Sequence, residues 1–359
     1  MTHKATSLRV RLRQAGIAIN ENDTQASPPI PWFVRVLQAF SGWLAALFLL
    51  GFIAMVAASV VESTLGSLSL GAMMLLAAFG LFCVTRSDVG EHLALAVSLA
   101  GQLLVAWGLA NVWETSAYLW WVLLGLQGVL ALVMPSHTHR GFSAFAASVA
   151  LYMALAMSAM GPVASGMVLL ALTALWLNEF RWSTRINHVQ AWGYGLLVGL
   201  LVIQGMAHTG GPLLYFDAGT AGIWAALTPW LGVALVALAL GALLLTRLDA
   251  SFSARARGAA YVCAVVLLIV TYHVPSVGQG VVVMLLGVAV VHRLLVGVGV
   301  LSLLLGIGSY YYSLETTLLV KSVTLLLIGG LLLSLRWALR YWLGSPMPIQ
   351  ADGSRDHDA

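Results

Sequence analysis

The chain has 359 residues, of which 60% are hydrophobic and only 8% are charged, and its mean hydropathy is +0.94. A soluble domain carries about 25% charged residues, so this chain has too little charge to cover a water-exposed surface. Its net charge of +4 comes from basic residues spread over short polar segments; because nucleic-acid binding needs a concentrated basic face, we expect contact with a lipid bilayer and none with nucleic acid.

Residues 1–31 form the first predicted unit, a basic segment on the cytoplasmic side of the membrane. Residues 5–19 carry leucines and arginines at helical spacing. This pattern fits either a short amphipathic helix on the membrane surface or a disordered basic tail. Pro28, Pro29 and Pro31 then break any helix and mark a linker. Because the segment has no apolar core of about 7–15 residues, we expect no cleavable signal peptide.

Residues 32–343 are predicted to form one polytopic transmembrane domain, followed by a polar cytoplasmic tail over residues 344–359. Its apolar runs are long enough, or nearly so, to cross about 30 Å of hydrocarbon. They cover residues 36–61, 65–84, 92–111, 117–134, 141–160, 162–178, 190–206, 222–246, 258–274, 279–291, 294–312 and 316–339. We therefore predict an all-α integral membrane protein, a bundle of about 12 transmembrane helices. The run 279–291 is short, and it is either a full span, a re-entrant segment or part of the next helix.

The placement of basic residues predicts the orientation of this bundle. If the N-terminus is cytoplasmic, every Lys and Arg except Lys321 falls on the cytoplasmic side of the predicted spans. Because basic residues are enriched in cytoplasmic loops, this segregation predicts that both termini are cytoplasmic. The outer connections are only a few residues long apart from residues 208–222, which leaves no room for a folded domain outside the membrane.

Lys321, the exception to this rule, lies near the start of the last predicted span, close to the outer face. A charge inside the bilayer is costly, so it needs a partner. We predict a candidate partner or substrate site made of this lysine with outer-face acids and tyrosines: Lys321, Glu315, Tyr310, Tyr311, Tyr312, Glu62 and Glu114. The alternative is that the lysine extends to the membrane surface through an ordinary aromatic belt.

Three further polar residues, His208, Asp217 and His273, are weaker candidates for a proton or metal site at the outer face, and the alternative is that they are ordinary polar loop ends. The spacing supports no metal-ligand set and no nucleophile–base pair, so we predict no catalytic residues, no metal and no cofactor. Gly195 and Gly199 form a small-xxx-small pattern that indicates helix packing within the bundle.

Three stretches of the sequence resemble one bacterial family of polytopic membrane proteins. They are residues 31–46 (PWFVRVLQAFSGWLAA), 91–96 (EHLALA) and 310–322 (YYYSLETTLLVKS), and the middle of the chain is similar in hydropathy. The family is known as domain of unknown function 4401. Its genes often lie beside one for a membrane-anchored protein with a Gly-Asp-Tyr-x-x-Leu-x-Tyr motif. The resemblance therefore implies a location in the bacterial inner membrane and a membrane partner, and it implies no established activity.

Two functions follow as hypotheses. The first is a non-catalytic inner-membrane component that binds or stabilises a membrane partner, with the outer tyrosines and glutamates in the contact. The second is a secondary transporter or lipid-handling protein that uses a buried Lys–carboxylate site near the outer face. The second hypothesis requires a polar cavity that reaches the bilayer midplane from one side and is lined by Lys321 or the outer acids. An enzyme is the least favoured alternative.

Overall fold

The computed structural model describes residues 32–56, 60, 62–85, 88–113, 116–158, 160–179, 181, 186–208, 223–247 and 253–313, and the single positions 319, 322, 323, 326, 330 and 333. The predicted terminal units 1–31 and 344–359 lie outside these residues, as does nearly all of the predicted span 316–339. The described helices are α2 (Trp32–Val56), α4 (Thr64–Val84), α5 (Asp88–Trp113), α6 (Ala117–Val133), α7 (His137–Ala156), α8 (Gly161–Leu177), α9 (Ile186–His208), α10 (Ile223–Arg247), α11 (Ala254–His273), α12 (Pro275–Ala289) and α13 (Arg293–Ser313).

The prediction of a helical chain with apolar helices of membrane-spanning length is confirmed. Every apolar run predicted between residues 36 and 312 coincides with one of these helices. Five helices of the described chain are long and apolar enough to cross a membrane: Thr64–Val84, Gly90–Trp113, Ile186–Ala207, Ala226–Arg247 and Ala254–His273. The predicted run 279–291 belongs to α12, a separate helix of 15 residues. At 1.5 Å per residue α12 is about 22 Å long, shorter than the ~30 Å of a bilayer core.

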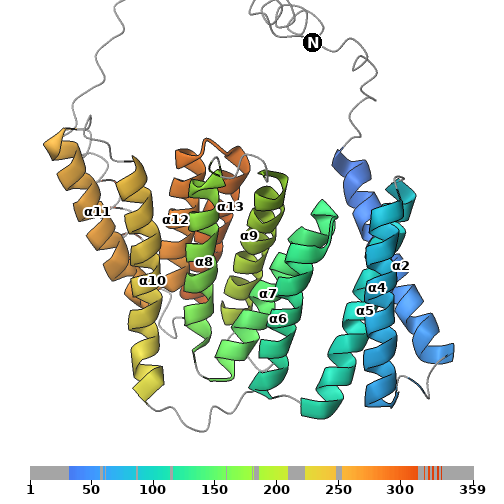
Figure 1. The fold of residues 1–359 in the computed structure, drawn as a ribbon. Helices are drawn as coiled ribbons and strands as arrows, with labels where there is room; N and C mark the ends of the chain where they lie inside the picture. Colours follow the sequence, from blue (N-terminus) through green and yellow to red (C-terminus); the bar gives the residue numbers. More distant parts are fainter. Residues whose placement is uncertain are drawn as a thin grey trace, which may run out of the picture.

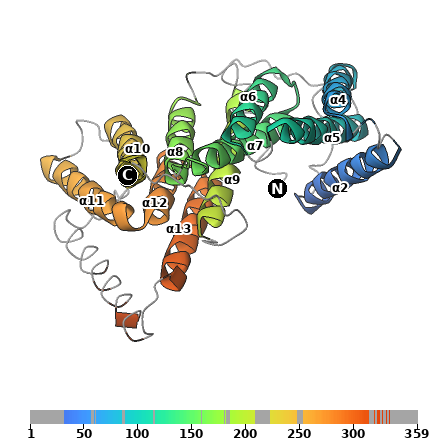
Figure 2. The same cartoon turned by 90° about the horizontal axis from the view of Figure 1, so that it is seen from below.

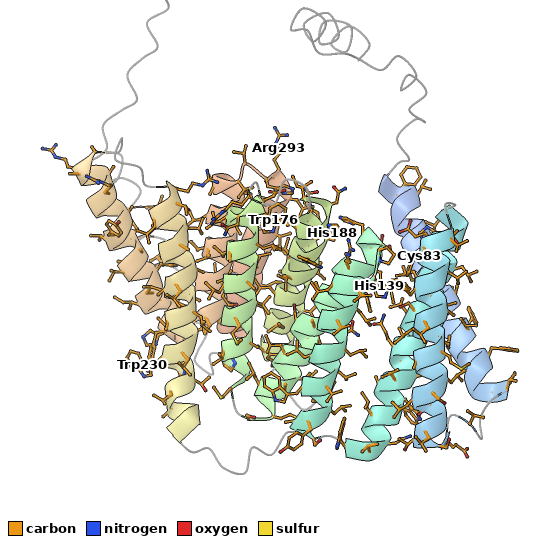
Figure 3. All side chains as sticks on the ribbon, in the orientation of Figure 1. Cys83, His139, Trp176, His188, Trp230 and Arg293 are labelled. Carbon is orange, nitrogen blue, oxygen red and sulfur yellow. The ribbon has the colours of Figure 1, made fainter. Side chains whose placement is uncertain are left out.

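Successive helices alternate in direction and stand side by side (Figure 1). Seen along their axes, they form a curved row rather than a closed ring, with α2, α4 and α5 as one group and α6 to α13 as the other (Figure 2). The alternation places the six described arginines of the second helix group at the same end of the row, where α7, α11 and α13 begin and α8 and α10 end. This arginine end carries Arg140, Arg181, Arg247, Arg255, Arg257 and Arg293, and Arg293 is labelled there in Figure 3. The opposite end, where α13 finishes, is called the Tyr310 end below.

Local sequence signals explain where several helices begin. The Ser63 hydroxyl accepts a hydrogen bond from the Gly66 N–H at 3.1 Å and caps α4. Ser253 caps α11 in the same way, which satisfies one of the backbone N–H groups left free in the first turn. Proline occupies the first turn of both α8 and α12, where its missing N–H costs nothing.

Glycine lets two pairs of helices approach closely. A Cβ added at Gly195 of α9 would collide with the carbonyl oxygen of Gly141 in α7, and one added at Gly199 would lie 2.6 Å from the Ser148 Cβ. The predicted role of Gly195 and Gly199 in internal packing is therefore confirmed. Between α12 and α13, a Cβ at Gly280 would lie 2.7 Å from the Leu303 nitrogen.

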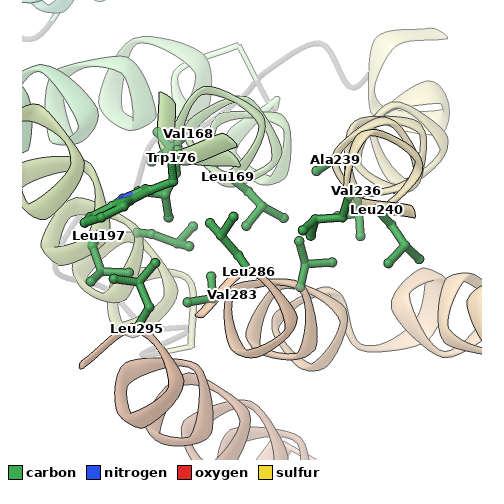
Figure 4. Packing of buried hydrophobic residues seen from close by; sticks show 14 of the residues in the cluster. Val168, Leu169, Trp176, Leu197, Val236, Ala239, Leu240, Val283, Leu286 and Leu295 are labelled. Carbon is green, nitrogen blue, oxygen red and sulfur yellow. The ribbon is translucent and has the colours of Figure 1, made fainter. Parts of the chain in front are cut away.

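The main hydrophobic core lies in the second group of helices. It joins α8, α9, α10, α12 and α13, and Figure 4 shows its packing. Fully buried members include Val168, Leu169, Leu197, Val236, Leu240, Val283, Leu286 and Leu295. This core holds α8, α9, α12 and α13 in fixed positions relative to one another.

Candidate functional site

A cavity of ≈ 280 Å³ opens at the Tyr310 end of the second helix group. It is bounded by α7, α8, α9, α12, α13 and the turn between α11 and α12. That turn is short because α11 ends at His273 and α12 begins at Pro275. The polar side chains that line the cavity are Tyr152, Ser165, Gln204, His273, Ser276, Gln279 and Tyr310, and the other lining residues are Gly161, Pro162, Ile203, Ala207, Val274 and Pro275.

A row of hydrogen bonds runs along the wall of this pocket and joins four helices. The Ser302 hydroxyl donates to Gln204 Oε1 at 2.7 Å, and Gln204 Nε2 donates to Gln279 Oε1 at 2.9 Å. Gln279 Nε2 then donates to Ser165 Oγ at 2.7 Å. Buried amides without partners would be costly, so this row fixes the rotamers of both glutamines.

The row retains hydrogen-bonding capacity for a ligand. A primary amide has two N–H donors and an oxygen with two lone pairs. Gln204 and Gln279 each use one N–H and one lone pair within the row, although both side chains are only 3% exposed. Within the described residues, the second N–H and second lone pair of each amide make no hydrogen bond, and both residues line the cavity. The pocket therefore presents both donors and acceptors on a rigid wall.

A second buried polar cluster connects α5, α6 and α7. The His139 side chain is 0% exposed, and its Nε2 lies 2.6 Å from Ser98 Oγ and 3.1 Å from Gln102 Nε2. Gln102 Oε1 accepts from Gln127 Nε2 at 2.8 Å, and Ser143 Oγ lies 3.3 Å from His139 Nδ1. Because an amide N–H donates to Nε2, the contacts favour the neutral tautomer with the proton on Nδ1.

This cluster lies where the two helix groups meet. Phe82 of α4 contacts the His139 ring edge-on, with ring centroids 5.8 Å apart. A small apolar cluster of Leu95, Ala96 and Leu99 with Phe82 and Phe142 packs at the same boundary. At its rim the Ser136 hydroxyl donates to Glu91 Oε1 at 2.7 Å. The cluster therefore holds the α2–α4–α5 group against the rest of the molecule.

The structure brings two of the predicted site residues to the pocket, namely Tyr310 and His273. Tyr311 follows in α13 and is half-buried. Glu62 is exposed and lies two residues before α4 begins at Thr64, and it is not among the residues that line the pocket. The side chains of Tyr312 and His208 lie outside the described residues, and so do Lys321, Glu315, Glu114 and Asp217. The Lys–carboxylate pair therefore stays a prediction.

The sequence analysis missed the glutamines that form both polar clusters. Gln102, Gln127 and Gln204 each lie inside a predicted apolar span, and Gln279 opens one. A neutral amide inside an apolar run is expensive unless it is bonded, so these positions were a usable signal. Which amides contact each other depends on helix pairing, and no local pattern encodes it. Within the described chain, no three His, Cys, Asp or Glu side chains are arranged to hold a metal ion.

Comparison with protein families matches residues 31–342 to the domain of unknown function (DUF4401). The chain belongs to this family. The resemblance predicted from the two ends of the sequence is thus confirmed, and the DUF4401 match contains the pocket, the His139 cluster and every described helix. The family description assigns no activity. Comparisons with curated proteins and with solved structures gave no match.

Proposed function

We propose that this DUF4401 protein is a non-catalytic binding component of the bacterial inner membrane, and that the pocket at its Tyr310 end holds the headgroup of a lipid. The observation that carries the proposal is the bonded row of Gln204 and Gln279, which keeps spare donors and acceptors beside the cavity. Ligand sites are concave, largely apolar and carry a few fixed polar groups, and this pocket has that composition.

The depth of the pocket favours a headgroup over a transport path. Ser165, Gln204 and Gln279 each lie four residues from a helix terminus, at Gly161, His208 and Pro275 respectively. Four residues correspond to about 6 Å along a helix. The bilayer midplane lies about 15 Å from the edge of the hydrocarbon, so the row is closer to the headgroups than to the midplane. Within the second hypothesis from the sequence, lipid handling fits this depth better than transport.

The bonding of Ser165 argues against hydrolytic chemistry. Its hydroxyl donates its single proton to the Pro162 carbonyl at 2.9 Å and accepts from Gln279. His273 also lines the cavity, but a nucleophilic serine must donate to its general base. The described lining therefore favours binding over catalysis.

The proposed topology has about 12 spans with both termini cytoplasmic, so the Tyr310 end faces outward. The gathering of the described arginines at the opposite end supports this orientation. A membrane-anchored protein encoded by a neighbouring gene is the second candidate partner, which the family resemblance favours.

The test is the retention of lipid by purified protein, measured by native mass spectrometry after release from mild detergent. We expect a bound lipid on the wild type and about a tenfold weaker association for Gln279→Leu, since losing a buried hydrogen bond costs about 1–3 kcal/mol. Gln127→Leu makes the same chemical change in α6, outside the pocket, and should retain the lipid.

Equal retention by Gln279→Leu and the wild type would overturn the lipid proposal. So would recovery of the wild type without lipid. If a membrane-anchored protein co-purifies at one copy per chain and is lost from Gln279→Leu, the pocket serves that partner instead.

A further inference from the structure

We infer that the headgroup recognised by the Tyr310-end pocket is zwitterionic, with its phosphate in the pocket and its ammonium against the exposed rings of Trp230 and Tyr272. The inference rests on the proposed function, because it names the chemical class of the lipid at the same pocket. Three features lead to it: the helices that begin at the cavity, the hydrogen-bond donors along its wall and an aromatic pair beside it.

Two helices begin at the cavity and favour an anionic group there. α8 begins at Gly161 and α12 begins at Pro275, and both residues line the cavity. The aligned peptide dipoles of a helix leave a partial positive charge at its N-terminus, which attracts anions and repels cations. Phosphate groups bind at helix N-termini for this reason. The phosphate of a headgroup is therefore favoured inside the cavity, and its ammonium is favoured outside.

Side chains along the wall supply donors to the same phosphate. Within the described residues, Gln204 and Gln279 each have one amide N–H that makes no hydrogen bond. His273 also lines the cavity, and its ring carries at least one N–H in either neutral tautomer. Hydrogen bonds to a charged acceptor are about twice as strong as those between neutral groups. Phosphate oxygens are thus the acceptors that gain most from these donors.

An aromatic pair lies beside the cavity at the same end of the bundle. The ring centroids of Trp230 in α10 and Tyr272 in α11 are 4.9 Å apart, and the Tyr272 ring meets the His273 ring edge-on at 5.3 Å. Because His273 lines the cavity, the pair begins one ring away from it. Trp230, labelled in Figure 3, is 62% exposed and Tyr272 is 40% exposed. Aromatic faces attract a cation within about 6 Å of the ring centroid, and tryptophan does so most strongly.

The level of the pair and the size of the cavity fit one phospholipid headgroup. Tyr272 is the last residue but one of α11, so the pair lies at the end of the helix, where headgroups are found. At ≈ 280 Å³ the cavity is at the lower end of the ~300–1,000 Å³ typical of ligand pockets, so the acyl chains remain outside in the bilayer. Ethanolamine and choline headgroups join phosphate to ammonium through a two-carbon link, which places the two charges on neighbouring surfaces such as these.

The test is a competition between lipids that share the same acyl chains. Delipidated protein is incubated with equal amounts of phosphatidylethanolamine, phosphatidylglycerol and diacylglycerol, and bound lipid is identified by native mass spectrometry. We expect phosphatidylethanolamine to exceed phosphatidylglycerol by about two- to fivefold, as one exposed cation–π contact provides. Diacylglycerol lacks the phosphate and should bind at least about tenfold more weakly than either phospholipid.

Two variants separate the aromatic pair from the pocket. Trp230→Leu should abolish the preference for phosphatidylethanolamine and leave the binding of phosphatidylglycerol unchanged, whereas Gln279→Leu should weaken both. The matched control is Trp121→Leu in α6, because Trp121 is also an exposed tryptophan near a helix start but does not line the cavity. An ordinary aromatic belt would make the two tryptophan variants alike. If Trp230→Leu does not fold, Tyr272→Leu replaces it, with the same expected loss of preference.

The outcomes distinguish this inference from the proposed function. Binding of phosphatidylglycerol that equals or exceeds that of phosphatidylethanolamine would overturn only the zwitterionic class, and so would a preference that survives in Trp230→Leu. Binding of diacylglycerol as strong as that of the phospholipids would overturn the role of the phosphate. If the wild type retains none of the three lipids, or if Gln279→Leu retains them as the wild type does, the proposed function itself is overturned.

A further sample identifies the source of the headgroup. Glycerophosphoethanolamine, which carries the same headgroup without acyl chains, is added in excess to protein loaded with phosphatidylethanolamine. We expect the lipid to remain bound, because its chains stay in the apolar surroundings of the helices. Complete displacement would identify a soluble phosphoester as the ligand and overturn the assignment to a lipid.

Discussion

At the scale of single residues, His139 is a fully buried histidine whose ring contacts three polar side chains. These side chains, Ser98, Gln102 and Ser143, themselves depend on it for hydrogen bonds. Replacing it leaves at least one of these buried groups without a partner, at about 1–3 kcal/mol for each unsatisfied group. We therefore predict that His139→Leu destabilises the protein by about 1–3 kcal/mol, with a lower midpoint of thermal unfolding in detergent.

The matched control for this substitution is His137→Leu. His137 begins the same helix two positions earlier, but its side chain is exposed. Surface substitutions usually change stability by less than about 0.5 kcal/mol, so the control should unfold with the wild type. Equal midpoints for His139→Leu and His137→Leu would contradict the structural role of the cluster.

At the scale of helices, stability depends on close approach at glycine. A Cβ at Gly195 would meet the Gly141 carbonyl oxygen and lie 2.8 Å from the Ala144 Cβ, so α7 and α9 must separate to admit it. We predict that Gly195→Ala lowers the free energy of unfolding by about 1–3 kcal/mol. Gly205 lies on the same helix with nothing within 4 Å of the added carbon.

Gly205→Ala should therefore match the wild type or stabilise it by up to about 1 kcal/mol, because alanine is the better helix former. Unfolding midpoints from tryptophan fluorescence measure both variants. A larger loss for Gly205→Ala than for Gly195→Ala would show that α7 and α9 do not pack along this seam.

At the scale of helices, the sequence predicts where each described helix lies but not which helices are neighbours. Apolar runs gave the position of each described helix, because a span must be apolar over most of its length. The spacing of Gly195 and Gly199 also predicted a packing face. Neither pattern names the neighbouring helix, since Gln204 and Gln279 are 75 positions apart and meet only after α9 and α12 are placed together.

The candidate site was predictable only in part for the same reason. Tyr310 and His273 were each placed near the outer face from their positions along separate spans, and the structure adds that they share one cavity. Glu62 was grouped with them because it too falls at an outer helix end. The helix that follows it, α4, belongs to the other group. Lying at the same predicted face of the membrane therefore did not place Glu62 close to Tyr310 and His273.

At the scale of the whole molecule, the curved row of helices has one end rich in arginine and one end with the pocket. The positive-inside rule then predicts that α4 crosses the membrane with Ser63 outside and Thr85 inside. With 21 residues α4 is about 31 Å long, enough to span about 30 Å of hydrocarbon. These two residues flank the same helix, so they form a matched pair for labelling.

The experiment places one cysteine at a time, Ser63→Cys or Thr85→Cys, in a chain that carries Cys83→Ser and Cys263→Ser. A maleimide that cannot cross membranes is added to cells with a permeable outer membrane. We expect Ser63→Cys to react at once and Thr85→Cys to react only after the inner membrane is opened. The reverse pattern would place the pocket on the cytoplasmic side, where a lipid of the inner leaflet would be its ligand. If both cysteines react while the inner membrane is intact, α4 does not span the membrane. That result would contradict the proposed topology.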